Sequence, residues 1–132
     1  MSFLRVAVVS LILLSSGCLG QGEGDLEFLG IEYRDPPEAP NFVLFDQNGD
    51  VFELIEHEGK VIVVAFVYTT CPDICLIISS NLDYVNKNLG DKTDDVVIIS
   101  VTIDPARDTI SHLSEWTDNR GYEWYHLTGP VS

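Results

Sequence analysis

The sequence has few basic residues and only three cysteines. Seven lysines and arginines stand against 21 aspartates and glutamates, so the 132-residue chain has a formal net charge of −14. Because nucleic acids and anionic lipids attract basic surfaces, this shortage argues against a nucleic-acid-binding protein and against membrane adhesion by charge alone. The acidity is typical of a well-solvated surface; adaptation to high salt and a basic partner are the alternatives.

The chain also lacks an apolar run of the about 20 residues that a comfortable membrane span needs. The longest N-terminal run, Val6–Leu14, is broken only by Ser10; it follows Arg5 and leads through small residues to Cys18. This order is typical of a signal peptide over residues 1–17. A small residue before cysteine resembles the lipobox of prokaryotic lipoproteins, although Leu14 lies one position early. We therefore expect Cys18 to carry lipid, with simple cleavage or an uncleaved anchor as alternatives.

The cysteine count agrees with export. If Cys18 carries lipid, Cys71 and Cys75 remain as one pair in an oxidising compartment. Residues 18–40 are rich in glycine, proline and acidic residues and predict a tether. Apolar residues between Leu26 and Tyr33 could still dock as an edge strand. Residues 41–132 then form the domain.

Two patterns predict strands at the start of this domain. The apolar runs around "DQNGD" indicate a hairpin over residues 41–54, because Asn48 and Gly49 both favour positive φ. The β-branched run Lys60–Tyr68 is continuous, which favours a strand buried on both faces.

A helical period follows, and then a second strand. The helix after Pro72 has one apolar stripe and ends at Gly90, and the apolar run 96–103 predicts the next strand. Together these elements predict a parallel βαβ unit in an α/β domain. The stripe consists of Cys75, Ile78, Leu82, Val85 and Leu89. A further helix, capped by Asp108 or Thr109, buries Ile110, Leu113 and Trp116 and closes at Gly121, and residues 122–129 start another strand.

The candidate site is the cysteine pair. Cys71 follows the first buried strand and Cys75 lies one helical turn later, so both sulfurs point in nearly the same direction from an exposed loop stiffened by Pro72. Backbone N–H groups at the helix start lower thiol pKa values. Such a pair can close a disulfide or hold a soft ion such as Cu(I). A passive disulfide or two buried thiols is the alternative.

Three segments resemble the SCO/SenC family of copper-binding, thioredoxin-like proteins. They are "VIVVAFVYTTCPDIC", "SVTIDPARDTISHL" and "HLTG", and the resemblance covers roughly residues 41–129. It implies a thioredoxin-like fold anchored at the outer face of the cytoplasmic membrane. It also implies that the protein helps to install copper in cytochrome c oxidase. By this resemblance Cys71 and Cys75 are copper ligands whose redox state governs binding.

The chain departs from the family at its end. The family's third ligand is a histidine beyond the "HLTG" segment, and that histidine, the C-terminal helix and the final hairpin are absent. We therefore expect a truncated product of low stability. Leu76 stands where the family often has proline, which is a minor difference.

The other polar residues near these motifs have ordinary interpretations. None of His57, His112 and His126 matches the family's ligand position, and each is interpreted as a surface or core residue. Asp73 shapes the loop or accepts a bond from a helix N–H. The charged turn that contains Asp104, Arg107 and Asp108 is interpreted as local capping and ion pairing, with a site-shaping role as the alternative.

Three functions remain open from sequence. The first is a copper chaperone, favoured because Thr70 precedes a CxxxC rather than the CxxC of thioredoxin-type reductases. The second is a thiol–disulfide reductase that acts on cysteines of a partner protein. The third is a remnant without function.

Overall fold

The computed structural model describes residues 29–130, so the predicted signal peptide and Cys18 lie outside the described residues. Contacts divide the chain into one unit up to Glu38 and a second from Ala39 onward. In the first unit, residues 29–38 form no strand, and Leu29, Ile31 and Tyr33 are exposed. The described part of the predicted edge strand is therefore absent.

The hairpin lies at the start of the second unit. β1 (Val43–Phe45) pairs antiparallel with β2 (Val51–Glu53). The Asp46 carboxylate accepts the backbone N–H groups of Asn48 and Asp50 at 2.8 and 2.9 Å, which closes the turn. Gly49 has a φ of 85°, whereas positive φ occurs at no non-glycine residue of the described chain. The turn therefore needs only Gly49, not Asn48, in the left-handed region.

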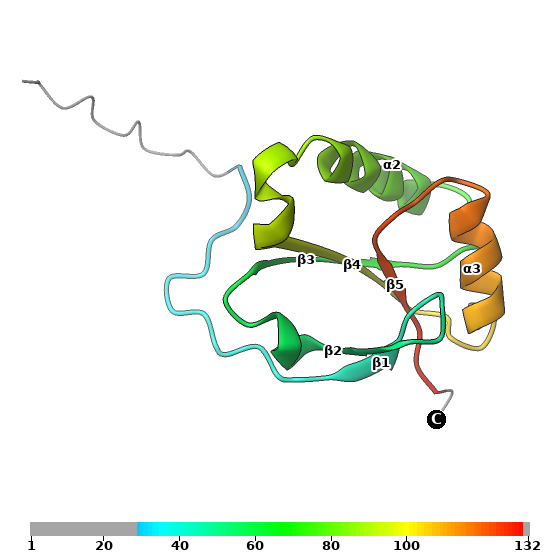
Figure 1. The fold of residues 1–132 in the computed structure, drawn as a ribbon, viewed down its shortest axis with the longest axis horizontal. Coiled ribbons are helices and arrows are strands. Elements are labelled where there is room, and N and C mark those ends of the chain that lie inside the picture. The colour runs from blue at the N-terminus through cyan, green and yellow to red at the C-terminus, as the bar shows by residue number, and fades with distance from the viewer. Residues whose placement is uncertain (1–28, 131–132) are drawn as a thin grey trace, which may run out of the picture. The chain divides into compact units, whose positions relative to one another are not determined.

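Three parallel strands form the main sheet, in the order β3–β4–β5. They are β3 (Val61–Val67), β4 (Val96–Thr102) and β5 (Tyr125–Leu127). Helix α2 (Ile74–Lys87) connects β3 to β4, and α3 (Ile110–Asp118) connects β4 to β5 (Figure 1). Two 3₁₀ helices, η1 (Leu54–His57) and η2 (Gly90–Asp95), precede β3 and β4. The predicted α/β class with a βαβ unit is confirmed.

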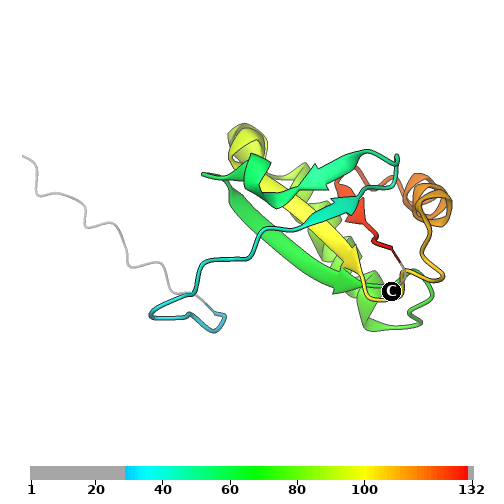
Figure 2. The same ribbon diagram turned by 90° about the horizontal axis from the view of Figure 1, so that it is seen from below.

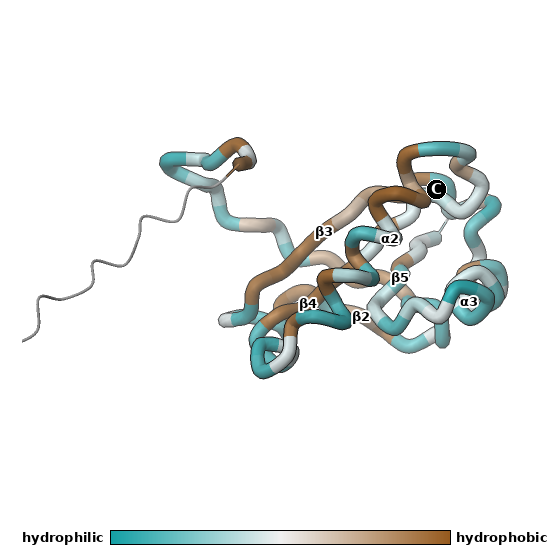
Figure 3. Tube along the Cα trace, turned by 90° about the horizontal axis from the view of Figure 1, so that it is seen from above, coloured by the Kyte–Doolittle hydropathy of each residue, from teal (hydrophilic) through white to brown (hydrophobic). Residues whose placement is uncertain are grey.

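The sheet is covered differently on its two faces. Helix α2 lies on one face and the β1–β2 hairpin on the other (Figures 1 and 2). Phe52 from the hairpin packs with Val97, Ile99 and Leu127 in a core cluster. Figure 3 shows the apolar character of β3 and β4 against the hydrophilic α3. β4 is thus the buried centre of the domain.

The expectation that β3 is buried on both faces is wrong. Val61, Val64 and Phe66 are 61%, 45% and 66% exposed. The reason is that the hairpin leaves most of β3 uncovered, at the edge of the described sheet. The hairpin packs over β4 and β5 and reaches β3 only near Ile62.

The predicted stripe of α2 is partly wrong. Cys75 is buried as expected, but Val85 is 42% exposed, and Ser79 is fully buried in its place. The sheet-facing side of α2 therefore includes Ser79 beside Cys75, while Ile78 and Leu82 of the predicted stripe are half-buried. At the helix start, Asp73 is the N-cap residue but its side chain makes no capping bond.

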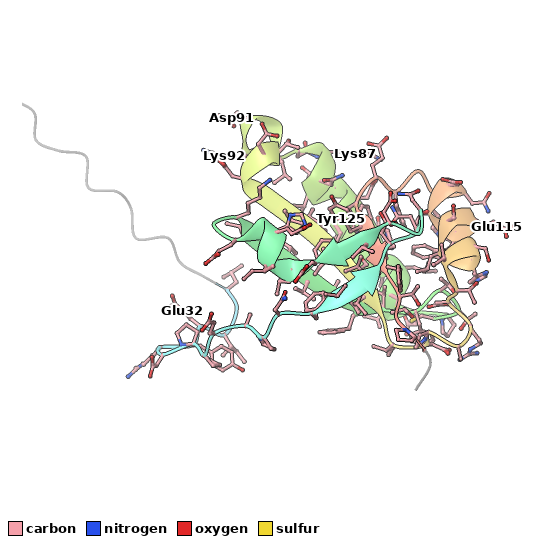
Figure 4. All side chains as sticks on the ribbon, turned by 60° about the horizontal axis from the view of Figure 1, so that its bottom comes forward. Glu32, Lys87, Asp91, Lys92, Glu115 and Tyr125 are labelled. Carbon is pink, nitrogen blue, oxygen red and sulfur yellow. The ribbon has the colours of Figure 1, made fainter. Side chains whose placement is uncertain are left out.

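Side chains of the hairpin fasten β5 to the domain. Gln47 donates to the carbonyl of Trp124 at 3.0 Å and accepts the N–H of His126 at 2.8 Å. Phe45 and Thr128 exchange two backbone hydrogen bonds. Tyr125 packs edge-on against Phe52, whereas Glu115 projects outward from α3 (Figure 4).

Candidate metal and thiol site

Cys71 and Cys75 lie at the junction of β3 and α2, and both are free thiols. The N–H of Cys71 donates to the carbonyl of Tyr68 at 3.2 Å, which closes a turn directly after β3. The N–H of Cys75 donates to Sγ of Cys71 at 3.4 Å. The sulfur of Cys71 therefore accepts one of the free N–H groups in the first turn of α2.

The prediction of an exposed pair is wrong in its detail. Cys71 and Cys75 are only 7% and 5% exposed and pack with Val67. Pro72, Asp73 and Ile74, which separate the two cysteines, are all exposed. The sulfurs thus lie beneath a surface loop, not on it, because the first turn of α2 folds its apolar side onto the end of β3.

The two thiols differ in acidity. The hydrogen bond with the Cys75 thiol, followed by the N–H of Asp73, lowers the pKa of Cys71. Desolvation, followed by the hydrogen bond with Cys71, raises the pKa of Cys75. The sequence predicted two easily ionised sulfurs, whereas the structure makes Cys71 the more acidic thiol and Cys75 the less acidic one.

Tyr68 takes part in the same arrangement. Its pKa is raised, chiefly by the hydrogen bond between its hydroxyl and Cys71. A phenol that keeps its proton beside a thiolate acts as a donor to it. Hydrogen-bond donors therefore lower the pKa of Cys71, and the N–H of Cys75 is one of them.

The charged turn after β4 divides into two roles. Asp104 and Arg107 form an ion pair at the surface, as predicted. Asp108 does not cap α3; that position belongs to Thr109, which accepts the N–H of His112 at 3.3 Å. Asp108 is instead 1% exposed and accepts the backbone N–H of Thr69 at 3.0 Å.

The sequence indicated a role for Asp108 in shaping the site only as an alternative. Its position could have indicated that role more directly, because Asp108 follows β4, the strand next to β3 in the sheet. Because the carboxyl ends of parallel strands lie at the same edge, a short polar residue after β4 can reach the residues after β3.

The three histidines lie in different surroundings. His57 stacks on Phe52 in η1, and His126 is buried among aromatic rings. His112 is exposed, with its Nε2 at 3.0 Å from Oγ1 of Thr69. Over residues 29–130, no three side chains of histidine, cysteine, aspartate or glutamate converge on one metal position.

Within the same residues, none of the helices has the length and apolar character that crossing a membrane requires.

A family model described as SCO1/SenC matches residues 32–132. A SCO2-like protein of Rickettsia typhi is 35% identical over 88 residues, which cover 67% of this chain and 43% of the relative. The SCO1 protein homolog of Bacillus subtilis is 30% identical over 105 residues, which cover 76% of this chain and 54% of the relative. The chain thus spans about half the length of these curated relatives, or less.

Solved structures are similar in the same way. ScoI of Bradyrhizobium japonicum with copper bound superposes with a TM-score of 0.64 at 30% identity, over 69% of this chain and 58% of that one. Yeast Sco1 with copper bound gives a TM-score of 0.62 at 28% identity, over 73% of this chain and 61% of that one. The thioredoxin-like fold predicted from the sequence is confirmed by these similarities.

Proposed function

Because this chain belongs to the SCO1/SenC family, we propose that it binds copper through Cys71 and Cys75 and assists assembly of the copper site of cytochrome c oxidase. Similar structures support the proposal: two are described with copper bound, and BsSco is described as a member of a family of cytochrome c oxidase assembly proteins.

The observation that carries the proposal is the reduced, unequal cysteine pair. Both thiols are free, and the N–H of Cys75 is 3.4 Å from the sulfur of Cys71. Thiolate sulfur is a soft ligand that selects Cu(I) over hard ions. The low exposure of both cysteines also keeps water and competing hard cations away from the sulfurs.

Copper is the cargo, and its uptake is coupled to protons. Cys71 has the lower pKa of the two thiols, whereas desolvation raises the pKa of Cys75. A metal-bound cysteine must be deprotonated, so binding releases the proton of Cys75. Apparent affinity should therefore rise with pH until Cys75 ionises on its own.

Anaerobic titration of the reduced full chain in detergent with Cu(I), against a competing chelator, tests the assignment. The Cys71→Ser, Cys75→Ser double variant should lose Cu(I) binding. Cys18→Ser is the matched control, because it removes a cysteine outside the pair and should bind as the unaltered chain does. Equal affinity in the double variant would reject the site.

Thiol–disulfide exchange is the second candidate, favoured by the unequal acidity of the pair. The Cys71 thiolate attacks a partner disulfide, whose S–S bond breaks to give a mixed disulfide and one partner thiolate. Cys75 then loses its proton and attacks the Cys71 sulfur, which forms a Cys71–Cys75 disulfide, breaks the mixed disulfide and releases the second partner thiolate. Two electrons thus pass from the cysteine pair to the partner, whose thiols leave reduced.

A trapping experiment separates this candidate from copper binding. The Cys75→Ser variant should accumulate mixed disulfides with partner proteins, and Cys71→Ser should accumulate none. If neither variant traps a partner, the reductase role is lost while the copper role stands.

Export and anchoring complete the proposal. We propose that residues 1–17 are removed and that Cys18 carries lipid at the outer face of the cytoplasmic membrane. A SCO1/SenC family lipoprotein of Bacillus anthracis supports this, with a TM-score of 0.63 at 26% identity. The intact mass of the mature protein tests it: lipid should be present on the chain and absent from the Cys18→Ser variant.

A further inference from the structure

A buried carboxylate joins the ends of the strands around the cysteine pair. Asp108 accepts the N–H and the hydroxyl of Thr69, and the hydroxyl of Thr102 at the end of β4. Its own carbonyl accepts the hydroxyl of Thr128, just after β5, at 2.8 Å. One residue therefore connects the carboxyl ends of β3, β4 and β5.

Asp108 forms no salt bridge within residues 29–130. Its neighbour Arg107 pairs with Asp104 instead. Burial of an ionised carboxylate is unfavourable unless hydrogen bonds replace the lost water. Here both carboxylate oxygens are occupied by protein donors, Oδ1 by the Thr69 hydroxyl and Oδ2 by the Thr69 N–H and the Thr102 hydroxyl. The carboxylate thus has a fixed orientation.

The residue that Asp108 holds is part of the turn that carries Cys71. That turn runs from Tyr68 to Cys71 and is closed by a 3.2 Å backbone bond. Thr69 is its second residue, and both its backbone and its side chain are bound to Asp108. Fixing Thr69 therefore limits the positions that the Cys71 sulfur can take.

His112 completes the chain of bonds at the surface. Thr69 Oγ1 gives its proton to Asp108, so at 3.0 Å it must accept a proton from Nε2 of His112. The hydroxyl rotor of Thr69 is thus fixed from both sides.

We propose that Asp108 is a positioning residue that, through Thr69, holds the Cys71 turn in the geometry that receives Cu(I). The inference rests on the proposed copper-binding function. Residues that orient metal ligands from the next layer typically alter metal affinity about 10- to 100-fold. Without this anchor, the turn has to be ordered during binding, and affinity falls.

Three variants and a matched control test the proposal on the reduced full chain. Thr69→Val removes the hydroxyl, Thr69→Ser retains it, and Asp108→Asn places an amide against the Thr69 and Thr102 donors. Thr117→Val is the control, because it also removes a buried hydroxyl, which donates to the Ser114 carbonyl at 2.9 Å in α3.

In competition titrations with Cu(I), Thr69→Val and Asp108→Asn should bind about 10- to 100-fold more weakly. Thr69→Ser should recover most of the affinity, and Thr117→Val should bind as the unaltered chain does. Unchanged affinity in Thr69→Val and Asp108→Asn, or an equal loss in Thr117→Val, would overturn the inference.

Amide hydrogen exchange provides a readout that needs no copper. The amides of Thr69 and Cys71 should exchange about tenfold faster in Thr69→Val and Asp108→Asn than in Thr117→Val, since a lost anchor of about 1.4 kcal/mol gives that factor. Slow exchange in both variants would reject the positioning role, whatever the chain's affinity for Cu(I). Fast exchange in a chain that binds no Cu(I) would instead reject the copper function and leave the anchor in place.

Discussion

Two buried polar clusters of this domain differ in how well their hydrogen bonds are satisfied. The strand-end network consists of Thr69, Thr102 and Asp108, and its polar side-chain atoms all have partners. The second set, called the interior cluster, consists of buried polar side chains on α2, α3 and β5. Four of its buried side-chain atoms have no hydrogen-bond partner among the described residues: Ser79 Oγ, Asp83 Oδ1, Trp116 Nε1 and His126 Nε2.

The difference separates positioning from packing. In the strand-end network the donors converge on one carboxylate and fix the turn before Cys71. In the interior cluster the ring of His126 lies 4.8 to 5.9 Å from the rings of Trp116, Tyr122 and Trp124. There the side chains contribute aromatic contact area, while their unpaired polar atoms weaken the fold. Polar satisfaction is thus complete in the strand-end network and incomplete in the interior cluster.

The largest expected effect comes from breaking the strand-end network with Asp108→Ala. Three hydrogen bonds to a charged group are worth roughly 1.5–3 kcal/mol each, offset in part by relief of the buried charge. We expect the free energy of unfolding to fall by about 4 kcal/mol, measured by urea denaturation. A loss below about 1 kcal/mol would mean that the network contributes no more than a surface contact.

The interior cluster should make the domain sensitive to acid. Burial lowers the pKa of His126 from 6.5 to about 4. The unfolded chain therefore binds the proton first as pH falls, so stability is lost from about pH 6.5 downward and levels off below about pH 4. Between pH 7 and pH 4 this histidine should remove about 3 kcal/mol of the free energy of unfolding.

A His126→Phe variant isolates that contribution. It keeps an aromatic ring among Trp116, Tyr122 and Trp124 but cannot titrate. Urea denaturation of both chains at several pH values should show a flatter profile for the variant over this range. Parallel profiles would show that His126 finds a partner for its Nε2 on protonation.

Ser79→Ala tests the interior cluster by removing an unsatisfied group. It should change the free energy of unfolding less than the variants above, and it should raise it rather than lower it. The Ser79 hydroxyl is fully buried and unpaired within α2. Alanine removes the unsatisfied group and has a higher helix propensity, so the free energy of unfolding should rise by about 1 kcal/mol. A clear loss of stability in urea denaturation would instead indicate a bound water at the hydroxyl.

The sequence predicted the parts of the fold that depend on local patterns and missed those that depend on which elements pack together. The sequence predicted the strands β3 and β4, and it predicted the CxxxC at the end of β3. Both follow from periodicity and local spacing. The exposed face of β3 was not predicted, since its apolar run resembles that of a strand covered on both faces. Ser79 was missed on α2 because a buried serine leaves no mark in an apolar pattern.

The site was predicted in its residues more than in its environment. The spacing placed Cys71 and Cys75 together, but their unequal acidity depends on which thiol is desolvated and which accepts an N–H. The anchoring of Thr69 by Asp108 spans 39 residues of sequence. Contacts over such distances follow from strand order, so they become visible only once β3 and β4 are known to be neighbours.

The smallest effect should come from Arg107→Gln, next to Asp108 in sequence but outside its network. Arg107 pairs with Asp104 at the surface, and its side chain is 65% exposed. Solvent screens such pairs, so the urea midpoint should shift less than in any variant above, and added salt should remove the shift. Asp104→Asn is the matched control and should behave alike. If Arg107→Gln lost as much stability as Asp108→Ala, the stabilising effect would come from proximity to the turn and not from buried hydrogen bonds.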